Sequence, residues 1–171
     1  MPMKILLLQL SLLLAPFAAA GQELSPGFGW FRDVVGHCWT GDLPNGVKHT
    51  HCYTSQFGRF IRGTSEIKSE KDGQAKVIFE GDSLFAWDEK GKRIVYYVWA
   101  SDGSHRQHEA EHLASELSFP VSSRADPGSV LYRSVWRQVS AETIEVRRER
   151  PDGQAWRTEF KVNYHRSPAT K

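Results

Sequence analysis

The residues best suited to metal binding or catalysis are two histidines near the end of the first third of the chain. His49 and His51 stand two positions apart, so on a β-strand both imidazoles project from one face and form half of a metal site. Beside a carboxylate, His51 is also a candidate general base near neutral pH. A metal site needs a third and a fourth ligand. A hydrogen-bonded or solvent-exposed histidine pair at a strand end is therefore the competing interpretation.

Other patterns associated with catalysis are absent from the sequence. It contains no nucleophile elbow, no glycine-rich phosphate loop and no His-Glu-x-x-His pair. His105, His108 and His112 lie in a polar, strand-like stretch, and an exposed strand explains them without a ligand. The sequence therefore leaves catalysis as an alternative and predicts no cofactor.

The chain has two cysteines, Cys38 and Cys52. If residues 44–46 (Pro-Asn-Gly) form a three-residue hairpin loop, residues whose numbers sum to 90 face each other, and the two cysteines are such a pair. Cross-strand Cβ atoms lie about 4.5–5.5 Å apart, near bridging distance, so we predict a disulfide. The opposite face of this hairpin then carries Trp39, His49, His51 and Tyr53.

The first twenty residues have the pattern of a secretory signal peptide. Lys4 precedes an apolar run from Ile5 to Phe17, and alanines 18–20 provide a cleavage point before Gly21. The apolar run is shorter than the roughly 20 residues that a membrane-spanning helix needs. We therefore predict a signal peptide over residues 1–20, no membrane span, and a periplasmic or secreted protein. An oxidising compartment also favours the disulfide.

Composition argues against one class of partner. The chain has 22 Lys and Arg against 20 Asp and Glu, so it lacks the basic excess of nucleic-acid-binding proteins. Aromatic residues make up 12% of the chain, with six Trp, five Tyr and nine Phe. Such residues suit half-buried strands and bulky interiors.

The pattern along the chain predicts an all-β domain. Residues 21–30 are expected to form a flexible lead, and residues 30–35 a short helical turn. Over residues 31–168 apolar and polar residues alternate between turn signals, which favours an antiparallel up-and-down barrel of about 8–10 strands. Residues 75–80 and 83–88 are expected as separate strands. In the last hairpin the alternation puts Trp156, Thr158, Phe160, Val162 and Tyr164 on one inner face.

Several short motifs carry a resemblance to a known family. Residues 35–41 (Val-Gly-His-Cys-Trp-Thr-Gly) resemble the opening Gly-x-x-Trp strand of lipocalin-like (calycin) barrels. Residues 62–63, 87–96, 133–136 and 152–164 are similar to bacterial lipocalin-like domains of unassigned function. The resemblance implies that Trp39 closes the base of the barrel against a late basic residue, Arg157 or Arg166. The related nitrobindin-type barrels bind haem through a histidine, and no motif for that ligand is found here.

These observations favour an exported barrel that binds a small apolar or amphipathic molecule. Candidate cavity residues are Trp39, His51, Tyr53, Trp87, Tyr97, Trp99, Trp136 and Trp156. Pockets for such ligands are mostly apolar, with a few polar anchors. The alternatives are a barrel whose rings simply fill the core, an isomerase or hydrolase using a cavity histidine such as His51, and a metal- or haem-binding barrel using His49 and His51.

Overall fold

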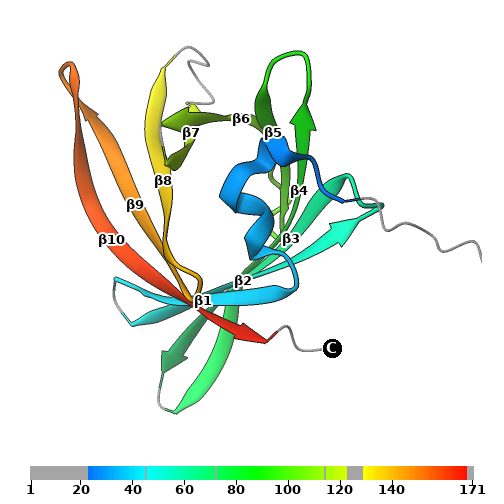
Figure 1. The fold of residues 1–171 in the computed structure, drawn as a ribbon. Helices are drawn as coiled ribbons and strands as arrows, with labels where there is room; N and C mark the ends of the chain where they lie inside the picture. Colours follow the sequence, from blue (N-terminus) through cyan, green and yellow to red (C-terminus); the bar gives the residue numbers. More distant parts are fainter. Residues whose placement is uncertain (1–22, 45, 72, 114, 123–128, 169–171) are drawn as a thin grey trace, which may run out of the picture.

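The computed structural model describes residues 23–168, except residues 45, 72, 114 and 123–128. The predicted signal peptide lies outside these residues. Ten antiparallel strands form one closed barrel, in which sequence neighbours pair and β1 pairs with β10 to complete the ring (Figure 1). The expected all-β up-and-down barrel is therefore confirmed. Within the described residues, no helix has the length and apolar character needed to cross a membrane.

The strands differ considerably in length. They are β1 (His37–Leu43), β2 (Val47–Gln56), β3 (Phe60–Lys71), β4 (Gln74–Asp88), β5 (Arg93–Ala100), β6 (His105–Leu113), β7 (Glu116–Ser122), β8 (Val130–Ser140), β9 (Thr143–Asp152) and β10 (Ala155–Pro168). The break expected between residues 80 and 83 does not occur. Gly81 pairs with Ser65 on one side and Ala100 on the other, so the ladder continues through it and β4 is one strand.

The β1–β2 hairpin has the predicted register. Cys38 faces Cys52, and the numbers of every facing pair sum to 90, through Leu43 and Val47 beside the turn. Gly46 has φ 71°, a conformation that glycine adopts readily. The two cysteines form the predicted disulfide, with their Cα atoms 3.9 Å apart.

Reduction of this disulfide should lower stability without abolishing the fold. The bridge closes a short loop between residues 14 apart, for which the chain-entropy model gives about 3 kcal/mol. We expect the reduced protein to keep its far-ultraviolet circular dichroism and to melt at a lower temperature. Thiol titration of the unfolded, unreduced protein should find no free cysteine, and two reactive thiols per chain would contradict the pairing.

A 3₁₀ helix, η1 (Pro26–Val34), fills one end of the barrel. Figure 1 views the barrel nearly end-on, and η1 lies at the centre of the ring of strands. The Ser25 side chain accepts a hydrogen bond from the Gly27 amide (3.3 Å) and caps the helix. Its buried side is formed by Phe28, Phe31 and Val34, each at most 1% exposed.

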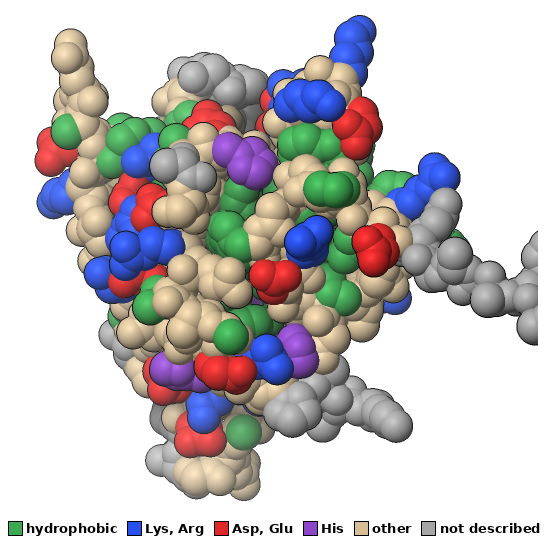
Figure 2. Space-filling model, viewed as in Figure 1, with side chains coloured by type: hydrophobic (Ala, Val, Ile, Leu, Met, Phe, Trp, Pro, Cys, Tyr) green, Lys and Arg blue, Asp and Glu red, His purple; other side chains and the backbone are tan. Residues whose placement is uncertain are grey.

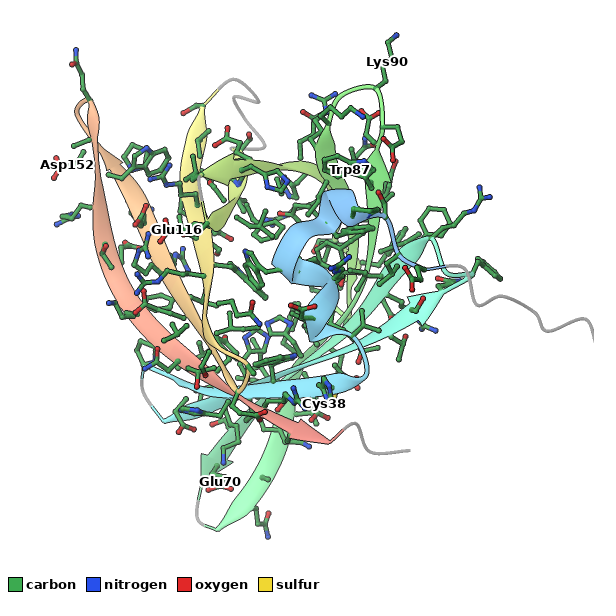
Figure 3. All side chains as sticks on the ribbon, viewed as in Figure 1. Cys38, Glu70, Trp87, Lys90, Glu116 and Asp152 are labelled. Atoms are coloured by element: carbon green, nitrogen blue, oxygen red, sulfur yellow. A yellow bond between two sulfur atoms is a disulfide. The ribbon has the colours of Figure 1, made fainter. Side chains whose placement is uncertain are left out.

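Residues 26–30 of the lead expected over residues 21–30 thus belong to η1, which has a kink at Gly29 (φ 55°). The apolar residues of this segment pack into the core of the barrel. Trp87 lies beside η1 (Figure 3), so close to Gly27 that a Cβ there would come within 2.0 Å of the indole ring. The indole of Trp39 donates a hydrogen bond to the Val34 carbonyl (3.2 Å). Across the closing pair of strands Trp39 faces Arg166, whereas Arg157 lies in the β9–β10 hairpin.

An ion-pair network covers the outer face of β7–β10. Arg147 contacts Glu116 (2.8 Å), Glu149 (3.1 Å) and Glu145 (3.3 Å). Further pairs join Arg133 to Glu149, Arg137 to Glu145 and Lys161 to Glu145. Figure 2 shows acidic and basic side chains intermingled on the left, and Figure 3 shows Glu116 beside β8 and β9. The Arg147 hydrogen bond holds the pKa of Glu116 below its usual value.

Candidate functional site

A cavity of about 180 Å³ lies inside the barrel beyond η1. About half of its lining residues carry an aromatic or imidazole ring, and most of the others are small or polar. Lining residues include His51, Tyr53, Phe85, Tyr96, Phe119, Tyr132, Ser134 and Trp136. These side chains come from β2, β4, β5, β7 and β8, so the cavity depends on closure of the whole barrel.

Phe31 of η1 closes the cavity on the helix side. Its ring contacts Phe85 at 5.0 Å, Tyr53 at 5.7 Å and both Phe119 and Trp136 at 6.3 Å between ring centroids. Three of these four contacts are edge-on, an arrangement that aromatic pairs favour. Phe31 is fully buried, so the cavity is closed on the helix side.

The two histidines lie on the inner face of β2 within an aromatic cluster. Their ring centroids are 4.0 Å apart, and the Nδ1 atom of His49 hydrogen-bonds to the Tyr164 hydroxyl (2.9 Å). The Nε2 atom of His49 is buried and has no hydrogen-bond partner in the described part of the chain. The ring of His51 lies against Trp136 at 5.5 Å and Tyr53 at 6.0 Å.

Burial keeps both imidazoles neutral at physiological pH. It lowers the pKa of His49 to about 4, and it lowers the pKa of His51 well below 6.5, with a further contribution from His49. No group of three or more His, Cys, Asp or Glu side chains that could hold a metal ion occurs among the described residues. The His51 ring packs against the rings of His49, Tyr53, Trp136 and Tyr164. This arrangement suits a neutral hydrogen-bonding anchor.

Stability should therefore fall as the pH is lowered from about 6.5 toward 4. Unfolded histidine binds a proton near pH 6.5, but folded His49 does so only near pH 4, so acid favours unfolding in this window. We expect a loss of roughly 1–3 kcal/mol, measured by urea unfolding at a series of pH values. His51→Phe should flatten the slope, whereas the exposed control His105→Gln should leave it unchanged. An equally steep slope in His51→Phe would contradict this explanation.

The structure separates the predicted cavity residues into three groups. His51, Tyr53 and Trp136 line the cavity together. Trp39 and Trp87 lie at the end filled by η1. Tyr97, Trp99 and Trp156 lie on the outside of the barrel, and Trp99 is 49% exposed. On β5 the even-numbered residues face inward. Ile94 and Tyr96 are buried, and Val98 packs against the core.

Trp156 is on the outside because β10 contains a bulge. Thr158 pairs with Glu149 and Phe160 with Arg148, which leaves Glu159 as an extra residue. The inner–outer alternation therefore reverses at Glu159. Phe160, Val162 and Tyr164 follow the predicted inner face, but Trp156 turns outward. There its ring lies 4.0 Å beneath the guanidinium of Arg133.

Sequence reasoning missed several residues that form the site. Phe85 could have been predicted from the alternation on its strand, because it lies two residues before Trp87 and on the same face. Phe28, Phe31 and Val34 recur every three residues, a helical spacing. That segment is too short for a clear helical pattern, and the glycines at positions 27 and 29 argue against a helix.

The fold and cavity define a closed ten-stranded antiparallel barrel with a partly hollow interior. No protein family matches the chain, and no curated protein matches it. Among solved structures it is similar to the crystal structure of Rv2717c from M. tuberculosis, with a TM-score of 0.57 and 12% sequence identity. The similarity covers 85% of this chain and 99% of that chain. At this level of identity it shows the barrel fold alone.

Proposed function

We propose that this protein binds a small apolar or amphipathic molecule in the barrel cavity. The observation that carries the proposal is the cavity itself, a hollow of about 180 Å³ walled by aromatic rings. The neutral His51 and the hydroxyl of Ser134 supply polar anchors in this wall. Ligand sites combine apolar walls with a few polar groups in this way.

The size of the cavity narrows the ligand class. An apolar protein cavity of about 150 Å³ holds a benzene molecule, whereas pockets for drug-sized ligands span roughly 300–1,000 Å³. The cavity of about 180 Å³ is therefore matched to a single ring or a short chain, not to a long fatty acid. For a ligand with so few atoms we expect dissociation constants of roughly 10 µM to 1 mM.

The predicted signal peptide and the disulfide support a role outside the cytoplasm. Disulfides persist in oxidising compartments such as the periplasm and the extracellular space. The Cys38–Cys52 bridge joins two strands of the barrel wall. A periplasmic or secreted binding protein is the proposal that combines these features with the cavity.

Binding can be tested with single-ring probes. We expect toluene to bind to the mature protein and to change the fluorescence of Trp136, which lines the cavity. Ser134→Phe should fill the cavity and weaken binding by at least about tenfold, because the ring would occupy the ligand's place. Ser140→Phe, on an exposed position of the same strand, is the matched control and should bind normally. Failure of toluene and of short-chain and polar single-ring probes to bind would refute the proposal.

A further inference from the structure

Arg148 lies on the inner face of the barrel beside the cavity. In the β8–β9 ladder it faces Ser134, which lines the cavity. Its guanidinium lies 4.0 Å from the ring centroid of Tyr132, a second lining residue, and 6.0 Å from that of Phe160. The Arg148 side chain remains 31% exposed, so its charge is at the mouth of the cavity and is not enclosed.

Arg106 brings a second positive charge to the same end of the barrel. It faces Val98 across the β5–β6 ladder, and Val98 lines the cavity. Arg106 shares the inner face of β6 with His108, whose ring stacks on Tyr96 at 5.2 Å. Both arginines lie near the strand ends opposite η1, since β6 begins and β9 finishes there.

The two carboxylates nearest the cavity, Glu159 and Asp82, are each already paired with an arginine. Glu159 contacts Arg148 (3.0 Å) and also pairs with Arg150. Asp82 reaches the cavity edge but pairs with Arg62 (3.1 Å). In the part of the chain that the structure describes, no ion pair of Arg106 is found. Glu159 meets Arg148 only at the Nε atom and forms no hydrogen bond with it, and no hydrogen bond from the terminal nitrogens of Arg148 is found within the described residues. These donors are therefore left for a ligand.

We propose that the cavity ligand is a small organic anion, whose apolar ring enters the aromatic cavity and whose carboxylate stays at the mouth beside Arg148, within the field of Arg106. This inference rests on the proposed function. A planar guanidinium binds a carboxylate through two parallel hydrogen bonds. Enclosing an anion among aromatic rings would be costly, so the charge belongs at the half-exposed rim. An amphipathic molecule with an apolar ring and a carboxylate therefore fits both the aromatic wall of the cavity and the arginines at its mouth.

Matched ligands test this inference on the unaltered mature protein. Phenylacetate and phenylacetamide have nearly the same shape and differ in charge, and toluene has no polar head. We expect phenylacetate to bind at least about tenfold more tightly than phenylacetamide in titration calorimetry at low salt. Sodium chloride at 0.5 M should weaken the anion more than the amide. If toluene and the amide bind as well as the anion, the inference fails and the proposed function stands. If none of the three binds, the proposed function itself fails.

Variants separate a local effect of Arg148 from general electrostatics. Arg148→Gln should remove most of the preference for phenylacetate over phenylacetamide, and Arg106→Gln should reduce it about two- to fivefold by removing a neighbouring charge. Arg32→Gln removes the same charge from the exposed side of η1, at the other end of the barrel, and should preserve the preference. Arg148→Lys should recover it only in part, since an ammonium lacks the planar fork. An equal loss in Arg32→Gln would overturn the assignment to Arg148. Circular dichroism checks folding, and the ligand comparison above needs no variant.

Discussion

Replacing Phe31 with alanine is expected to lower the free energy of unfolding by about 3–5 kcal/mol. Phe31 is fully buried and contacts rings from β2, β4, β7 and β8. Its loss would leave a void between η1 and the wall that the rigid ring of strands cannot close. Since domains of this size have total stabilities of about 5–15 kcal/mol, the variant should melt roughly 10 °C lower.

The matched control for this change is Phe57→Ala. Phe57 is 76% exposed, so the same truncation there should change stability by less than about 0.5 kcal/mol. Urea unfolding followed by circular dichroism measures both variants. If Phe31→Ala were as mild as Phe57→Ala, η1 would not be an integral part of the core, and the cavity would be open at both ends.

Replacing Arg147 with methionine is expected to cost about 2–4 kcal/mol at pH 7. Arg147 is 19% exposed and contacts three glutamates, of which Glu145 and Glu149 are themselves nearly buried. Removing this cation leaves carboxylates close together without their common partner. Arg93→Met is the matched control, because Arg93 also contacts two carboxylates but is 45% exposed. It should cost no more than about 1 kcal/mol.

The effect of Arg147→Met should depend on pH in a defined direction. The hydrogen bond from Arg147 is the main reason that the pKa of Glu116 lies below its ordinary value of 4.5. A carboxylate with a lowered folded pKa contributes stability above about pH 4.5 and loses it as the pH falls through the folded pKa. The difference between wild type and variant should thus shrink below pH 4.5. A constant difference from pH 7 to pH 3 would show that lost packing dominates.

The β1–β2 hairpin could be predicted closely from the sequence because its turn sets the register. Once residues 44–46 are assigned to a three-residue loop, every cross-strand pair follows, including the disulfide between Cys38 and Cys52. The same register places His49 and His51 on the face of Trp39, where the structure has them. The length of the turn therefore determines the register of the whole hairpin.

The remaining cavity wall could not be predicted in the same way. On β5, residues 94–99 are Ile-Val-Tyr-Tyr-Val-Trp, so both faces are apolar and alternation does not distinguish Tyr96 from Tyr97. On β10 the extra residue at Glu159 reverses the alternation, and no glycine or proline marks the bulge. The size of the cavity is also inaccessible from sequence, since it depends on how Phe31 meets side chains from four strands.

Closure of the ring by β1 and β10 has a consequence for how the chain folds. The pair Thr40 and His165 lies at opposite ends of the chain, so the last strand has to be present before the wall is complete. Such long-range contacts carry a high loop-closure entropy and are typical of proteins that fold in milliseconds to seconds. Until β10 arrives, the nascent chain has two unpaired sheet edges open to other extended chains. Completion of the last strand removes both edges at once.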